Sequence, residues 1–280
     1  MDIQTKNELQ ITACKVRMGI IEGVHAAKSG HPGGSLSSAD ILTYLYFKEL
    51  NVDPNNPDMP TRDRFVLSKG HIAPALYSVL ANKGFFALDD LKTLRKIGSF
   101  LQGHPDKKGT PGVDMSSGSL GQGISCATGI ALSAKHFNEN YRVFALLGDG
   151  ECEEGQVWEA AMFAANKELD NLVAIVDYNG LQIDGSIDEV NSPLPLDKKF
   201  EAFNWNVIKI DGHDFDQIEE AFNKASENKG KPTVIIATTI KGKGVSFMEN
   251  QVSWHGAAPN DEQYEIAMSE LNAQLETLTK

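Results

Sequence analysis

The sequence has few cysteines and no long hydrophobic stretch. Its three cysteines, Cys14, Cys126 and Cys152, are an odd number, and no two stand in a CxxC spacing. This argues against a disulfide framework or a zinc site and is typical of a reducing compartment. No apolar run reaches the roughly 18 residues of a membrane-spanning helix, and the start, MDIQTKNELQ, lacks the apolar core of a signal peptide. We therefore expect a soluble, cytoplasmic protein that does not bind membranes.

Positive charge is scarce as well. Lysine and arginine number 26 against 38 aspartates and glutamates, which gives a net charge of −12. A chain this acidic does not bind nucleic acid through bulk electrostatics. If it binds a polyanionic ligand, the positive charge must come from a local source: a metal ion, a helix N-terminus or a few histidines.

Beyond residue 140, apolar segments alternate with helical ones. The segments YRVFALLG, NLVAIVDY, NVIKI and TVIIATT predict strands, and an earlier one, RFVLS, predicts another. Strands that are apolar throughout and alternate with helices favour a parallel sheet covered on both faces. We expect an α/β fold with a doubly wound, mostly parallel sheet. Since no repeat or linker divides the chain, residues 1–280 should form one domain with a C-terminal helical extension from about residue 261. Helices are expected over 7–27, 39–50, 73–82, 88–97 and 119–137.

The expected helix over 119–137 contains three glycines, Gly121, Gly123 and Gly129. Each interior glycine costs about 1 kcal/mol relative to alanine. Such a helix needs a packing reason, of which the simplest is a close approach of two backbones.

Two polar residues follow buried strands one strand–helix–strand unit apart. Asp149 lies in the GDG that ends one strand, and Asn179 ends the next. Ligands of open parallel sheets bind at the carboxyl ends of strands, where Gly148 and Gly150 would let the backbone approach a ligand closely. A carboxylate and an amide oxygen suit Mg²⁺ or Ca²⁺, which would share its ligands with a phosphate group. Alternatively, GDG is a turn and Asn179 a cap.

Six of the seven histidines lie beside a glycine or two residues from one, which places them on turns where a ring can face a cleft. Any one of them is equally explained as a loop or surface residue. No pair has the spacing of zinc ligands.

Six blocks of the sequence together resemble the N-terminal, diphosphate-binding domain of transketolase, over about residues 10–260. These blocks are SGHPGGSLSSAD, LSKGHIAPALY, QGHPDKKGTPGVDMSSGSLGQGIS, GDGECEEG, DGHD and WHG. The resemblance implies thiamin diphosphate as the cofactor, with Mg²⁺ held by Asp149, Asn179 and the backbone carbonyl of Leu181. It also implies that Gly150 N–H meets the diphosphate. The chain departs from many thiamin enzymes in having Tyr178 before Asn179, where they have a second asparagine.

The same resemblance implies roles for further residues. His31 and His104 would bond sugar hydroxyls, His71 and His255 would lie near the diphosphate and the reacting centre, and His31 with His255 would move protons. His25, His136 and His213 gain no such role. Other implied contacts are Gly118 and Leu120 with the cofactor, Glu154 in a carboxylate network between active sites, and the small-residue helix at a subunit interface. Glu154 is equally explained as an acidic residue at a helix N-terminus.

Only 24 residues follow the WHG block, and they predict one polar helix. One helix cannot form the second domain that binds the pyrimidine ring in this family. We therefore expect a partner chain, the C-terminal transketolase subunit, in an α₂β₂ assembly acting on sugar phosphates. Such an enzyme moves a two-carbon ketol unit from a ketose phosphate to an aldose phosphate.

Three other functions remain open from the sequence. The α subunit of a 2-oxoacid dehydrogenase is disfavoured, because a 2-oxoacid needs no row of histidines for sugar hydroxyls. A deoxyxylulose phosphate synthase is disfavoured by its one-chain design and by the QGHP and WHG blocks. A non-catalytic scaffold subunit is disfavoured because every matched metal and histidine position is intact.

Overall fold

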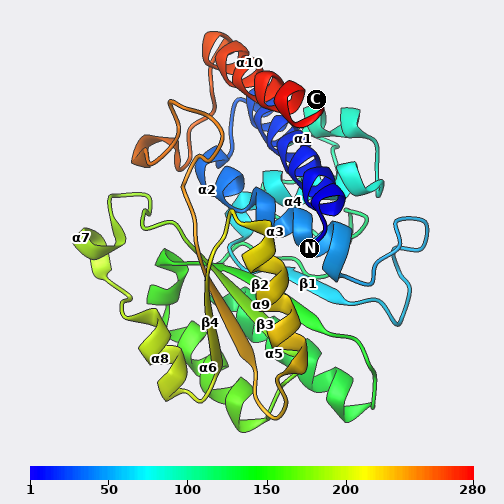
Figure 1. The fold of residues 1–280 in the computed structure, drawn as a ribbon, viewed down its shortest axis with the longest axis vertical. Coiled ribbons are helices and arrows are strands. Elements are labelled where there is room, and N and C mark those ends of the chain that lie inside the picture. The colour runs from blue at the N-terminus through cyan, green and yellow to red at the C-terminus, as the bar shows by residue number, and fades with distance from the viewer.

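A five-stranded sheet lies at the centre of the computed structural model, which describes residues 1–280 (Figure 1). The strands lie side by side in the order β1-β2-β3-β5-β4, and every neighbouring pair is parallel. This confirms the predicted parallel α/β fold. The strands are β1 Arg64–Leu67, β2 Val143–Gly148, β3 Leu172–Tyr178, β4 Asn206–Asp211 and β5 Thr233–Thr238.

Helices cover both faces of the sheet, because alternate residues of the central strands enter two separate hydrophobic clusters. In β2, Phe144 and Leu146 belong to the larger cluster, and Ala145 and Leu147 to the smaller. The larger cluster is covered by α1 Ile3–Ala27, α2 Pro32–Ser37, α3 Ala39–Tyr44, α4 Ala73–Lys83, α9 Phe215–Glu227 and α10 Asp261–Leu278. The smaller cluster is covered by α5 Gln122–His136, α6 Gly155–Asn166 and α8 Leu196–Ala202, while α7 Ile187–Asn191 lies in the loop after β3.

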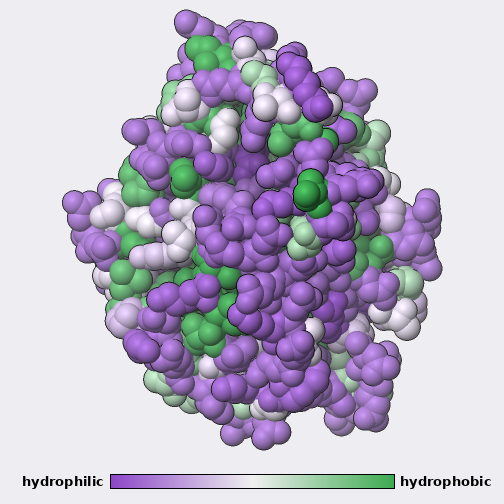
Figure 2. Space-filling view, viewed as in Figure 1, coloured by the Kyte–Doolittle hydropathy of each residue, from purple (hydrophilic) through white to green (hydrophobic).

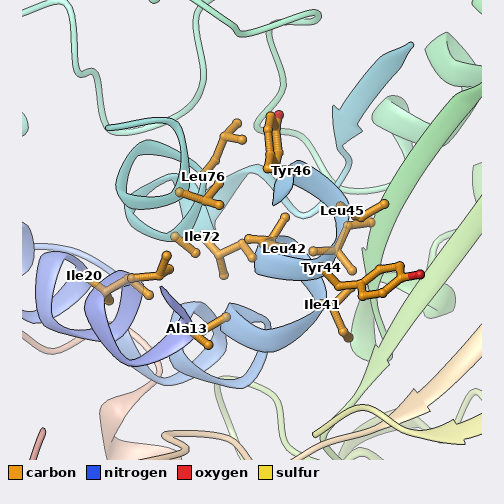
Figure 3. Packing of buried hydrophobic residues seen from close by; sticks show 14 of the residues in the cluster. Ala13, Ile20, Ile41, Leu42, Tyr44, Leu45, Tyr46, Ile72 and Leu76 are labelled. Atoms are coloured by element: carbon orange, nitrogen blue, oxygen red, sulfur yellow. The ribbon is translucent and has the colours of Figure 1, made fainter. Parts of the chain in front are cut away.

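The larger cluster is thick because its helices pack on one another as well as on the sheet. Ala13 and Ile20 lie two turns apart on one face of α1 and are both buried. Figure 3 shows the side chains of α1, α3 and α4 pointing toward one another in this layer. In Figure 1, α10 lies along α1 on the outside of the same layer.

Local structure differs from the expectations at four helices. The expected helix over 39–50 is α3 followed by a π-helical turn, in which Leu50 N donates to Leu45 O at 2.8 Å. The expected helix over 88–97 is only a 3₁₀ helix, Leu88–Thr93, because Arg95 and Gly98 have positive φ angles of 59° and 85°. The short helices α2 and α7 were not expected; α2 starts at a proline, which suits a first helical position.

The glycines near α5 have distinct causes. Gly121, with φ +80°, caps the N-terminus, so the helix begins at Gln122 rather than at residue 119. Gly123 packs on the backbone of β1's end: an added Cβ would lie 2.5 Å from Ser68 Cα. The predicted close approach of two backbones is therefore confirmed for Gly123. Gly129 instead faces open space, with nothing within 4 Å of an added Cβ.

Hydrophilic side chains cover most of the face seen in Figure 2, including the outer side of α9, and apolar residues form only small separate patches. Among the helices, none combines the length and the apolar character that a bilayer crossing requires.

Candidate functional site

A cavity of about 280 Å³ opens at the carboxyl ends of β2 and β3. Nine of the predicted site residues line it: His31, His71, Gly118, Leu120, Asp149, Gly150, Asn179, Leu181 and His255. The structure thus brings together residues that lie more than 200 positions apart in the sequence.

Asp149 and Asn179 follow neighbouring strands, as their spacing predicted, because Gly148 of β2 pairs with Asp177 of β3. The Asp149 carboxylate is held from two sides: Gly150 N–H donates to Oδ1 at 2.8 Å and Gly180 N–H to Oδ2 at 2.6 Å. Burial, followed by the negative charge of Asp177, raises the pKa of Asp149 to about 6. A buried carboxylate in this state is poised to gain from a cation placed beside it.

The other predicted metal ligands present oxygens to the same cavity. The Asn179 amide donates from Nδ2 to Asp177 Oδ2 at 3.1 Å, and its Oδ1 accepts from Leu181 N–H at 3.1 Å, which leaves the second lone pair of Oδ1 for a cation. The Leu181 carbonyl faces Lys241, whose Nζ donates to it at 3.0 Å. Nowhere do three or more His, Cys, Asp or Glu side chains gather so that they could hold a metal alone. The residues therefore fit a hard cation that takes further oxygens from a bound ligand.

Two buried lysines supply positive charge that we did not anticipate. Lys69 and Lys241 both line the cavity, and each is only 2% exposed. Lys69 is paired with the fully buried Asp177, whereas Lys241 Nζ contacts the Leu181 carbonyl and, at 3.0 Å, His255 Nδ1. Burial, then the charge of Lys69, lowers the pKa of Lys241 to about 8. Because Lys69 is already paired with Asp177, Lys241 is the ammonium group of this cavity that is available to attract an anionic ligand.

The backbone beside Asp149 packs closely against Gln182 at Gly150, where there is little room for a side chain. An added Cβ at Gly150 would lie 3.3 Å from Gln182 Cβ, at the edge of tight contact. Gly150 also begins the 3₁₀ helix Gly150–Glu153, which Asp149 caps by accepting from Gly150 N–H.

His31, His71 and His255 form a cluster at one wall. Their ring centroids lie 5.2 to 5.5 Å apart, with His71 and His255 stacked and His31 edge-on to both. Burial lowers the pKa of each; that of His31 falls to about 4 and that of His255 to about 3. These rings are neutral near pH 7, so each can both donate and accept a hydrogen bond. His31 Nδ1 is buried without a hydrogen-bond partner.

Two predicted residues do not line the cavity. His104 is exposed at the rim of the cavity, and its ring packs over Gly118. A Cβ added to Gly118 would lie 3.3 Å from the His104 ring. Glu154 is exposed at the start of α6, and the cavity is lined instead by Glu151, which is buried and accepts from Ser68, Gly121 and Gly148. Their predicted roles stay predictions.

A second cavity, of about 340 Å³, lies at the opposite edge of the sheet. Two of its cations are already paired: Arg142 with Glu49 and Asp63, and Lys135 with Asp170. It has no histidine and contains none of the predicted site residues.

The histidine cluster makes acid stability a test of the site. Below pH 6.5 these histidines become protonated in the unfolded chain, whereas in the folded chain they stay neutral down to about pH 4. The free energy of unfolding should therefore decrease as the pH is lowered through this range. Each histidine lowers the free energy of unfolding by at most about 1.4 kcal/mol per pH unit, and by less where solvent screens the ring. Asp149 opposes part of this loss, because its raised pKa makes the folded state take up a proton first.

We expect the His255→Gln variant to lose less stability than the parent chain between pH 6.5 and 4.5. Urea unfolding at both pH values measures this difference. Equal losses in the two proteins would show that burial of His255 does not set its ionisation.

Comparison with known proteins identifies the family. Residues 9–275 match the family model described as transketolase, thiamine diphosphate binding domain. The chain is 45% identical to a 6-deoxy-6-sulfo-D-fructose transketolase subunit of Clostridium sp., with 95% of this chain and 97% of the relative aligned. It is 42% identical to an apulose-4-phosphate transketolase subunit of Phocaeicola vulgatus, over 100% and 98% of the two chains.

Longer transketolases match over part of their length. The chain is 43% identical to human transketolase, of which it covers 44%. The crystal structure of Campylobacter jejuni transketolase superposes with a TM-score of 0.90 at 34% identity, over 99% of this chain and 46% of that one. The chain therefore belongs to the transketolase family, as a transketolase-type transferase subunit comprising the thiamine diphosphate-binding domain.

Proposed function

We propose that the cavity binds thiamin diphosphate through Mg²⁺, and that the chain, with a partner subunit, transfers a two-carbon ketol unit between sugar phosphates. The observation that carries this proposal is the pair Asp149 and Asn179, which end adjacent strands beside two buried lysines. An oxygen-ligand pair next to a buried ammonium group suits a metal–diphosphate complex.

In this proposal Asp149, Asn179 and the Leu181 carbonyl hold the metal, with Ca²⁺ able to substitute for it. Lys241 and the Gly150 N–H face the diphosphate, while Gly118 and Leu120 line the wall toward the pyrimidine ring. Bound thiamin diphosphate supplies a carbon nucleophile that also serves as an electron sink. The chain contributes binding, orientation and proton transfer.

The neutral histidines suit the proton transfers of ketol transfer. His31 and His255 can each accept a proton from a substrate hydroxyl and return it, because their rings are uncharged near pH 7. His31 Nδ1 is buried and makes no hydrogen bond within the chain. His71 closes the same wall, and His104 is placed at the rim to bond a sugar hydroxyl. Glu154, exposed near α5, remains a candidate for contact between active sites.

We propose that a C-terminal transketolase subunit completes the site by enclosing the pyrimidine ring, and that an assembly with two copies of each chain forms in the cytoplasm. The open space at Gly129 on α5 supports packing of that helix against a neighbouring chain. Residues 1–280 would act as one binding domain, with α10 part of it.

The donor substrate is proposed to be a ketose with an anionic end group. The two subunit relatives are named for a sulfonated ketose and a ketose phosphate. Both classes share the ketol end on which the chemistry acts.

The experiment that tests this function is reconstitution. The purified chain alone should transfer ketol units at less than about 1% of the rate of the complex, since half of the cofactor contacts are missing. Xylulose 5-phosphate with an aldose phosphate should react, whereas pyruvate, offered as a control, should not. Full activity of the isolated chain, or turnover of pyruvate alone, would contradict the proposal.

A further inference from the structure

The segment Ile240–Gly244, which follows β5, carries Lys241 into the cavity. Its backbone is tied to the helical layer at several points: Gly242 N–H donates to Gly33 O at 2.9 Å, and Arg17 Nε donates to Lys243 O at 3.0 Å. The segment also contains two positive-φ glycines, Gly242 and Gly244, so its conformation depends on such contacts rather than on regular secondary structure.

His213 contacts the residue that precedes Lys241. Its Nε2 lies 2.9 Å from Ile240 N, and its Nδ1 lies 2.7 Å from Asp40 Oδ2. A backbone N–H can only donate, so Nε2 is the acceptor and Nδ1 carries the proton that is donated to Asp40. The ring therefore bridges a buried carboxylate to the residue before Lys241.

Asp40, which accepts from the His213 ring, is itself held in place by Arg17. Asp40 receives two hydrogen bonds from Arg17, at 3.0 Å to Oδ1 and 2.6 Å to Oδ2, and both side chains are nearly buried. Burial raises the pKa of Asp40, but Arg17 lowers it further, to a net value of about 2. Asp40 thus remains an acceptor for His213 at any physiological pH.

Neither of the other two histidines outside the site has such a connection. His25 pairs with the exposed Asp261 and stacks on Tyr264, and His136 packs on Phe137. His213 does not line the cavity, so any effect on the ligand must pass through the 240–244 segment.

We propose that His213, oriented by Asp40 and Arg17, is a positioning residue that fixes the Ile240 amide and thereby holds Lys241 in the cavity. The proposal rests on the proposed function only for its consequence, which is the affinity for a diphosphate; the restraint on Lys241 is a property of the ligand-free chain.

Two isosteric variants separate the ends of the bridge. His213→Gln places an amide oxygen near the position of Nε2 and can still accept from Ile240 N–H. His213→Asn places an amide N–H near the position of Nδ1 and can still donate to Asp40, but it has no acceptor for Ile240. His25→Asn is the matched control, because it removes a histidine–aspartate pair far from the 240–244 segment.

The first measurement uses the full chain without ligand. Amide hydrogen exchange at 240–244 and acylation of Lys241, read by mass spectrometry, should each rise roughly tenfold in His213→Asn, the effect of losing one intramolecular hydrogen bond. Both should remain near the parent level in His213→Gln and His25→Asn. Lys69, equally buried but on another element, should remain unreactive in all four proteins.

The second measurement is binding of inorganic pyrophosphate with Mg²⁺, by titration calorimetry on the complex with the partner subunit. Affinity should fall roughly tenfold in His213→Asn and be rescued in His213→Gln. Lys241 protected in His213→Asn, or Lys69 exposed to the same degree as Lys241, would overturn the proposal. Absence of pyrophosphate binding by the parent protein would instead refute the diphosphate site, while the acylation result would still decide the role of His213.

Discussion

Replacing Asp149 by asparagine should abolish Mg²⁺-dependent binding of thiamin diphosphate. The change removes the only carboxylate among the three proposed metal ligands, and the charge of a ligand dominates its affinity for a hard cation. Loss of a residue that merely supports a metal ligand costs 10–100-fold, so loss of the ligand itself should exceed roughly 100-fold. Titrating the complex with cofactor at a fixed Mg²⁺ concentration measures this loss of affinity.

The metal-free chain distinguishes this effect from misfolding. Ionised Asp149, with a pKa raised from 3.8 to about 6, costs the folded state roughly 3 kcal/mol at neutral pH. The amide of Asp149→Asn carries no such charge cost, but its Nδ2 cannot accept from one of the two backbone N–H groups that bond Asp149, which costs about 1–3 kcal/mol. The two effects offset, so the unfolding temperature of the metal-free variant should stay near that of the parent chain. Asp170→Asn, at the other end of β3, is the matched control and should bind cofactor normally. Normal cofactor binding by Asp149→Asn would refute the metal site.

Breaking the ion pair between Lys69 and Asp177 should cause the largest loss of stability. Asp177 is fully buried and accepts from Ser37 Oγ at 2.6 Å, from Thr239 and from Lys69. Removing one member of a buried pair leaves the other charge uncompensated, which costs about 3–5 kcal/mol. Asp177→Ala and Lys69→Met should each lose that much in urea unfolding.

A double-mutant cycle supplies the control. The double variant should lose less than the sum of the single variants, because it leaves no unpaired charge. Lys198→Met removes the exposed pair with Glu201 and should change stability by less than about 0.5 kcal/mol. Additive losses in the cycle would mean that the two charges do not interact.

The sheet, and the position of Asp149 and Asn179 at one edge of it, could be predicted because they depend on local patterns. Apolar runs such as NLVAIVDY identify strands, and residues that directly follow neighbouring parallel strands must lie at one edge. The helix boundaries were less predictable. The expected helix over 88–97 ended early because Arg95 adopts a left-handed conformation, which nothing in its residue type signals.

The charged residues of the cavity could not be found in the same way. Asp177 is one polar residue in an apolar strand, and its partners come from residues 37, 69 and 239, which only the fold brings together. Lys69 and Lys241 could have been suspected only weakly from the sequence. Each directly precedes a glycine, in a segment of mostly small or apolar residues. His213 lacked an implied role because it acts through the backbone of Ile240, a contact that leaves no pattern in the sequence.

The packing of α10 gives the far end of the chain an influence on ligand affinity. Leu271 of α10 is fully buried, its carbonyl accepts from Cys14 of α1, and its side chain would touch a Cβ at Gly244 at 3.6 Å. Arg17, on the same helix as Cys14, holds both Asp40 and the carbonyl of Lys243. Deleting α10 would therefore remove a packing contact of the 240–244 segment, so a C-terminal tag is a safer modification than a C-terminal deletion.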